Sequence, residues 1–274
     1  MDEVSCYLRQ TAITDPGPLS GLPADPGALA RIVGGVLIHR DWAWKWGVQL
    51  PDERRDEANL RFVPAMRARL GSLRERPADQ RVAGTCRDFA VLLVALLRAA
   101  GVPARARAGF AGYFTPGFYD DHWVTEVWSE DRGWYLVDAQ VASAEPGAYG
   151  TGGLDPLDVP RDGFLVGGQA WRECRSGQRD PKTVGTSAAG LTGLWEVQGN
   201  VIRDLAALGG VEALPWDNWG LIPVHYDELP EADRSLLDRL AAVSAAGGPR
   251  HLALEALQLD PRLPVPDELS RPRG

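Results

Sequence analysis

Runs of apolar residues separated by turn-forming residues divide the chain into predicted helices and strands. The clearest element is residues 84–101, GTCRDFAVLLVALLRAAG, where Leu, Val and Ala fill a helix. Thr85 and Asp88 have the spacing of an N-terminal capping box, and Gly101 suits the helix end. Cys86 is therefore predicted to lie in the first turn of this helix.

Three strand candidates follow this helix. Residues 104–113 place Arg105 and Arg107 on one face, which we interpret as solvated rather than as a site for an anionic group. Residues 122–128 and 134–138 flank a polar turn, so they are expected to form an antiparallel hairpin. The pattern predicts an α+β fold in which the cysteine-bearing helix packs on an antiparallel sheet.

The other segments give weaker signals. A helix is predicted over residues 28–38, and residues 56–74 look helical with a kink or break at Pro64. Three tryptophans alternate as in a short extended segment: Trp42, Trp44 and Trp46. Residues 145–163 are expected to be a long loop and residues 260–274 a frayed tail. Additional C-terminal helices are predicted over residues 164–171, 194–208, 231–244 and 250–258.

Composition excludes several classes of protein. The 274 residues include 37 acidic and 29 basic ones, and the net charge of −8 argues against nucleic-acid and anionic-membrane partners. We find no apolar run of ~18 residues, as a membrane span requires, and no secretory leader pattern near the start. The 3 widely spaced cysteines do not resemble a disulfide framework. A cytoplasmic protein is therefore expected.

Three residues have the chemistry of a nucleophilic site. Cys86 at a helix start meets unpaired N–H groups that favour the thiolate, although a buried structural cysteine is the alternative. His122 begins a strand, where it could face a cleft or stack on Trp123. Asp138 ends a strand, where it could simply bind a turn amide. The hairpin register places His122 roughly opposite residues 139–140, so the three supply a nucleophile, a base and an orienting carboxylate.

The segments GTCRDFAVLLVALLRAAGVPARARAGF, DDHWVTEVW and GWYLVDAQ resemble the core of the transglutaminase-like superfamily. The resemblance is close over residues 80–141 and implies a papain-like arrangement with a Cys-His-Asp triad. It implies that Cys86 is the nucleophile, His122 the general base and acid, and Asp138 the orienting carboxylate. One departure is the sequence Asp138-Ala139-Gln140, where many members of the family have Asp-Pro-Thr.

This resemblance implies a cysteine-dependent acyl-transfer enzyme with a thioester intermediate and no cofactor. It would act as an amide hydrolase or an amide-forming acyltransferase on a small-molecule, peptide or carrier-bound acyl substrate. The rest of the chain looks like a bacterial stand-alone branch of the family, suggested by PRDGFLVGGQAWRECR and LPWDNWG. The alternative is a non-catalytic binding module on the same scaffold. The substrate, the choice between hydrolysis and transfer, and the oligomeric state stay open.

Further candidates concern the oxyanion and the substrate. The backbone N–H of Cys86 is one predicted oxyanion donor, and Trp44 or Gln49 is a candidate for the second, although packing explains both side chains equally well. Three residues could line a substrate pocket or pin the C-terminal part to the core: Trp216, Asp217 and Trp219. We find no CxxC or HExxH motif, so no metal site is expected.

We expect a single domain of 274 residues made of three successive parts. The first is a helical part over residues 1–79, and the second is the catalytic core over residues 80–145. Residues 146–274 are expected to form an extension that covers this core.

Overall fold

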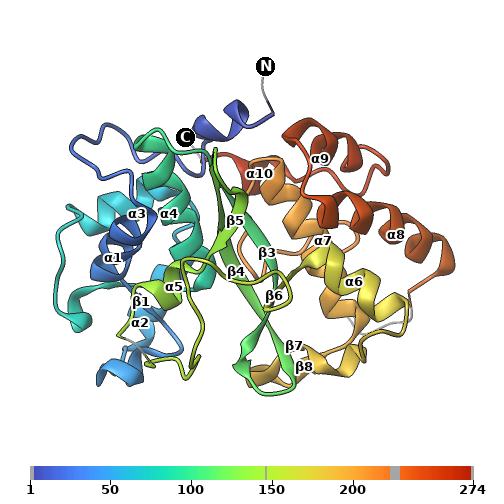
Figure 1. Ribbon diagram of the computed structural model, residues 1–274, viewed down its shortest axis with the longest axis horizontal. Coiled ribbons are helices and arrows are strands. Elements are labelled where there is room, and N and C mark those ends of the chain that lie inside the picture. Colours follow the sequence, from blue (N-terminus) through green and yellow to red (C-terminus); the bar gives the residue numbers. More distant parts are fainter. Residues whose placement is uncertain (1–2, 146, 223–228, 273–274) are drawn as a thin grey trace. The chain divides into compact units, whose positions relative to one another are not determined.

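The computed structural model describes residues 3–145, 147–222 and 229–272. Its helices and strands form an α+β fold, as the sequence pattern predicts (Figure 1). The chain forms two compact units, both discontinuous in sequence. Unit 1 comprises residues 1–106, 124–159 and 271–274, and unit 2 comprises residues 107–123 and 160–270. The expected organisation as one domain of three successive parts stays a prediction.

Unit 1 contains the predicted cysteine-bearing helix. Its α-helices are α1 (Pro26–Val36), α2 (Asp52–Arg55), α3 (Val63–Leu70), α4 (Cys86–Ala99) and α5 (Ala139–Ala142). The short strands β1 (Leu37–His39) and β2 (Val82–Gly84) pair in parallel, with His39 opposite Gly84. Helix α4 packs against both α1 and α5. This packing buries α4 on nearly every side, because its apolar residues are spread around the whole helix.

Strands β3 (Ala104–Thr115) and β4 (Phe118–Ser129) are neighbours joined by a two-residue turn, so they run antiparallel. In unit 1 the end of β4 pairs with β5 (Gly133–Val137), and Thr125 lies opposite Val137. This pairing confirms the predicted hairpin. The Thr125 hydroxyl donates to the carbonyl of Ala90 at 3.1 Å, which attaches the hairpin to α4.

Two further strand pairings lie within unit 2. Strand β6 (Phe164–Val166) pairs antiparallel with β3, and β7 (Val184–Thr186) pairs in parallel with β4. Strand β8 (Leu191–Thr192) pairs antiparallel with β7. The strand order is therefore β6-β3-β4-β7-β8, with β5 beside β4. The sheet is therefore mixed, whereas the sequence predicted an antiparallel one. The difference is β7, a strand of three residues too short to give a periodic signal.

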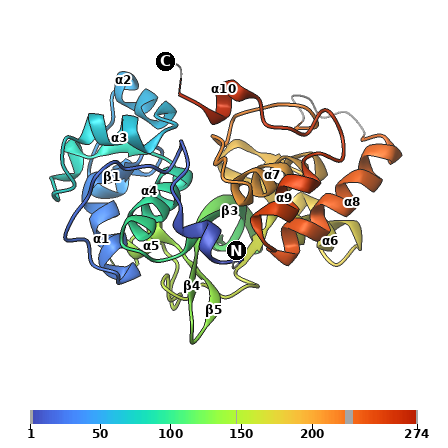
Figure 2. The ribbon, with the colours of Figure 1, turned by 90° about the horizontal axis from the view of Figure 1, so that it is seen from above.

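The helices of unit 2 gather around one apolar core (Figure 2). They are α6 (Gly167–Arg175), α7 (Leu194–Leu208), α8 (Glu231–Ala246), α9 (Arg250–Ala256) and α10 (Asp267–Ser270). Helix α6 approaches α8 closely at Gly168, whose N–H donates to the Ser244 hydroxyl at 2.9 Å. A Cβ at this glycine would collide with the backbone carbonyl of Ala241.

Substituting Gly168 by alanine is therefore expected to destabilise the protein by about 1–3 kcal/mol, because the added methyl forces α6 away from α8. Urea unfolding at 25 °C measures the change. The matched control is Gly152→Ala, since no atom lies within 4 Å of a Cβ built there. An equal effect of both substitutions would contradict the close approach at Gly168.

Arg105 and Arg107 correct the expectation of a solvated strand face. Both are buried, at 2% and 1% exposure. Arg105 pairs with Glu126 at 2.7 Å and stacks on the Trp134 ring at 4.1 Å. Arg107 forms two bonds of 2.9 Å with the carboxylate of Asp204. The prediction was wrong because these acidic partners are 21 and 97 residues away in sequence.

Four other predicted elements need correction. The tryptophan segment is a 3-10 helix, Ala43–Trp46, because its N–H groups bond backwards within the segment and Gly47 ends it at φ 69°. The helix predicted over residues 56–74 is shorter, because α3 begins only at Val63; the expected break is present there, and Pro64 lies in the first turn, where no N–H is required. Residues 164–166 form β6 before α6 starts. The tail is not frayed at Leu263, which is fully buried in the core of unit 2.

Candidate functional site

Cys86 is the first residue of α4, as predicted. The Thr85 N–H donates to the Asp88 carboxylate at 2.8 Å, so the expected capping box fixes the start of the helix. Arg87 forms a buried ion pair with Asp88 at 3.0 Å, which holds the same turn. The Cys86 thiol is reduced and only 8% exposed. Cys86 therefore lies in the first turn of the helix, whose N–H groups have no partner within the helix.

Asp138 follows β5 directly and is fully buried. One carboxylate oxygen accepts the N–H of Val141 at 2.9 Å, so Asp138 caps α5. Asp138 therefore does bind a turn amide, which was one of the two roles considered from the sequence. This hydrogen bond fixes the orientation of the carboxylate. Because β5 pairs with β4, and Thr125 of β4 bonds to Ala90, the end of β5 is attached to the second turn of α4. Asp138 and Cys86 both belong to unit 1.

His122 lies in the part of β4 that belongs to unit 2 and is 2% exposed. Its ring packs against aromatic side chains rather than facing solvent. The Phe114 ring is 4.9 Å away, centroid to centroid, and the rings of Tyr113 and Phe164 are at 6.1 and 6.4 Å. These rings restrict the orientation of the imidazole. The catalytic roles of Cys86, His122 and Asp138 stay predictions at this point.

Tyr149 is a residue that the sequence did not indicate. Its buried ring packs against the rings of Trp42 at 4.8 Å and Trp46 at 5.5 Å. Burial raises the pKa of Tyr149 far above its ordinary value, and the nearby charges of Asp138 and Cys86 raise it further. The phenol therefore stays neutral near pH 7. No periodic or turn signal in the loop could have identified it.

Strand pairing brings the start of the tryptophan segment close to the residues that precede α4. His39 ends β1 opposite Gly84, two residues before Cys86. The backbone N–H of Trp42 then bonds to the carbonyl of His39 at 3.1 Å, which folds the segment back at this end of the strand. The tryptophan pattern was visible in the sequence, but its position depends on a pairing between strands 45 residues apart.

Trp44 and Gln49, the candidate oxyanion donors, are both on the surface of unit 1. The Trp44 side chain is 66% exposed, and the Lys45 ammonium lies over its ring at 4.9 Å. Their role in stabilising an oxyanion stays a prediction.

The candidates Trp216, Asp217 and Trp219 belong to unit 2. Trp219 is in the core, and its indole N–H donates to the Leu263 carbonyl at 3.1 Å. The Asp217 carboxylate accepts the N–H of Leu214 at 2.7 Å. Trp216 is 37% exposed. Trp219 and Asp217 thus have packing and turn-forming roles, while a substrate role for the three stays a prediction.

The other two cysteines have different surroundings. Cys6 is half-buried, and its thiol donates to the Glu3 carbonyl at 3.2 Å. Cys174 is near the end of α6, where burial raises the pKa of its thiol to about 11. Helix α6 begins at Gly167, so Cys174 is well removed from the N–H groups of the first turn. Cys86 alone among the three opens an α-helix.

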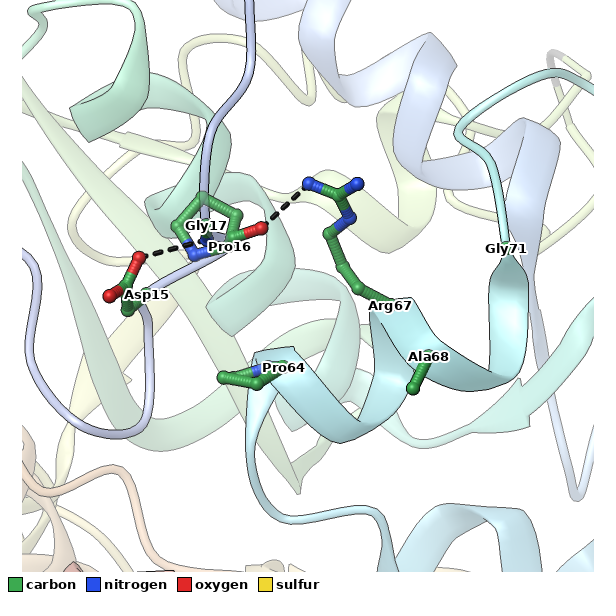
Figure 3. A pocket seen from close by; sticks show the side chains of 7 residues that line it. All are labelled: Asp15, Pro16, Gly17, Pro64, Arg67, Ala68 and Gly71. Atoms are coloured by element: carbon green, nitrogen blue, oxygen red, sulfur yellow. Dashed lines mark hydrogen bonds between the residues drawn. The ribbon is translucent and has the colours of Figure 1, made fainter.

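A cavity of about 510 Å³ lies between the loop after Thr14 and helix α3 (Figure 3). Its lining residues are Asp15, Pro16, Gly17, Pro64, Arg67, Ala68 and Gly71. The Arg67 guanidinium donates to the Pro16 carbonyl at 2.6 Å, so its charge serves to hold the loop. None of the candidate catalytic residues lines this cavity.

Residues 66–139 match the family model of the transglutaminase-like superfamily. The matched segment includes Cys86, His122 and Asp138, so the resemblance seen in the sequence is confirmed there. In general terms this match indicates a cysteine-dependent enzyme. Within the described residues, every helix is too short or too polar to cross a membrane.

A solved structure of a candidate cysteine protease from Cytophaga hutchinsonii is similar to this chain at 19% identity. The similarity covers 61% of this chain and 46% of that chain, with a TM-score of 0.32. A similarity at this TM-score does not indicate a function. The comparison with curated proteins gives no match.

Proposed function

Because residues 66–139 match the transglutaminase-like superfamily, we propose that the protein transfers acyl groups through a thioester on Cys86. In this proposal His122 is the general base and acid, and Asp138 orients its imidazole. The enzyme acts as an amide hydrolase or an amide-forming acyltransferase on a small-molecule, peptide or carrier-bound acyl group.

The observation that carries the proposal is the attachment of the β4–β5 hairpin to α4. Cys86 opens α4 and Asp138 follows β5, while the bond from Thr125 to Ala90 joins the two elements within unit 1. His122 precedes Thr125 by three residues in the same strand. At a rise of about 3.3 Å per residue, chain continuity keeps its Cα within about 10 Å of that of Thr125. This supports a role for His122 together with the other two residues.

The chemistry proceeds in two steps. The Cys86 thiol loses its proton to His122, and the sulfur attacks the acyl carbonyl to give a tetrahedral oxyanion. The C–S bond forms and the bond to the leaving nitrogen breaks, while His122 returns the proton to that nitrogen. Water or an amine then attacks the thioester, His122 accepts its proton, and the proton returns to the departing sulfur. Neither step changes an oxidation state, so the reaction requires no redox partner.

The oxyanion requires hydrogen-bond donors at the helix start. The backbone N–H of Cys86 is one proposed donor, since the first N–H groups of a helix have no partner within it. Trp44 or Gln49 remains the proposed source of the second. Trp216, Asp217 and Trp219 remain proposed for substrate binding.

Selective alkylation tests the proposed nucleophile. We expect iodoacetamide at pH 7 to modify Cys86 at least about tenfold faster than Cys174, because burial raises the pKa of Cys174 to about 11. Peptide mass mapping of a time course measures the rates for all three cysteines. In His122→Ala the Cys86 rate is expected to fall. If Cys86 reacts no faster than Cys6 and is unaffected by the His122 substitution, a binding module replaces the enzyme as the best account.

A further inference from the structure

The side-chain amide of Gln140 contains a buried oxygen atom that is not hydrogen-bonded within the described part of the chain. The residue is 2% exposed and lies in α5, two positions after Asp138. Its side-chain oxygen Oε1 has no hydrogen-bond partner among the described residues. Leaving such an acceptor unsatisfied in a folded protein is costly, so a donor from a bound molecule would stabilise it.

The surroundings of Gln140 point to the candidate active site. Helix α5 packs against α4, the helix that Cys86 opens. The Gln140 side chain bonds to the Tyr149 hydroxyl, and Tyr149 is close enough to Cys86 and Asp138 to respond to their charges. The Tyr149 ring is in turn fixed by Trp42 and Trp46. The amide of Gln140 is thus held in one place, with its oxygen unoccupied.

Only certain substrates could use this oxygen. A carbonyl oxygen accepts hydrogen bonds and donates none, so its partner must carry an N–H or O–H. An amide substrate carries an N–H on its leaving nitrogen, whereas the corresponding position of an ester is an oxygen with no hydrogen. An acceptor at this place therefore distinguishes amides from esters of the same acid.

We propose that Gln140 Oε1 accepts a hydrogen bond from the N–H of the amide that Cys86 attacks, and so selects amides as acyl donors. The inference rests on the proposed function. Gln140 is then a specificity-determining residue at the position where many family members have threonine. Tyr149 is its positioning residue, because it fixes the amide group of Gln140.

Matched acyl donors test this proposal. The probes are a 4-nitroanilide and a 4-nitrophenyl ester of the same acid, and the rate of Cys86 acylation is followed by intact mass for several acids. Gln140→Met keeps the length of the side chain and removes the acceptor. We expect the anilide-to-ester rate ratio to fall about tenfold or more, the usual effect of losing one such hydrogen bond, while the ester rate changes little.

Two further variants separate selection from a structural effect. Gln140→Glu keeps an acceptor oxygen and is expected to retain most of the ratio. Gln10 is a matched control, because its Oε1 also lacks a partner among the described residues while its amide nitrogen donates to Ala95 in the middle of α4. Gln10→Met is expected to leave the ratio unchanged.

The outcomes are distinct. If the ester acylates Cys86 and Gln140→Met leaves the anilide-to-ester ratio unchanged, the role of Gln140 is refuted and the proposed function stands. If neither probe acylates Cys86, the proposed function fails and this inference fails with it.

Discussion

Replacing Cys86 by alanine is expected to lower the rate of acyl transfer by about 10⁴-fold or more, because no other group replaces the sulfur in the thioester. His122→Ala is expected to cost about 10²–10⁴-fold, the usual contribution of a general acid and base. Both effects are measured as the rate of amine release, with an amide donor that acylates Cys86 in the experiment described above.

Cys174→Ala provides the matched control for the nucleophile. It removes a second buried thiol, but one whose raised pKa keeps it protonated at neutral pH. Its activity is expected to equal that of the wild-type protein. Circular dichroism and the melting temperature of Cys86→Ala should match those of the wild type, since only one sulfur atom is removed. Retention of full activity in Cys86→Ala would refute its role.

Asp204→Ala is expected to destabilise the protein by about 3–5 kcal/mol, the largest stability effect that we predict. The substitution leaves the Arg107 guanidinium, which is 1% exposed, without the carboxylate that binds it through two bonds of 2.9 Å. It also removes the acceptor for the Ser244 hydroxyl at 2.6 Å. Urea unfolding followed by fluorescence measures the loss.

A double-mutant cycle distinguishes the interaction between Arg107 and Asp204 from a simple loss of packing. Arg107→Met combined with Asp204→Leu replaces the charged pair by apolar side chains, so no buried charge remains uncompensated. We expect this double variant to be more stable than the sum of its single substitutions predicts, by at least about 1 kcal/mol. Additive effects would show that the two side chains do not interact energetically.

Local sequence signals predicted the elements around Cys86 well. Thr85, Asp88 and Gly101 mark the ends of α4, and the hairpin strands carry apolar residues beside a polar turn. These signals act within one element, so they can be read without knowledge of the fold. Cys86 and Asp138 were identified because each lies at the end of such an element.

The missed features depend on contacts between distant parts of the chain. Arg105 and Arg107 looked solvated because their acidic partners, Glu126 and Asp204, belong to other elements. Tyr149 lies in a loop whose composition indicates only flexibility, yet it is fixed by the Trp42 ring. Gln140 was visible as a departure from the family pattern, but its unpaired oxygen could be recognised only from packing.

Trapping the acyl-enzyme tests the central claim most directly. After brief reaction with a 4-nitrophenyl ester and acid quenching, the account predicts a mass increase equal to one acyl group. Peptide mapping should locate this group on Cys86, and neutral hydroxylamine should remove it, as expected for a thioester. An acyl group found on another residue, or none on Cys86 while the ester is turned over, would contradict the account.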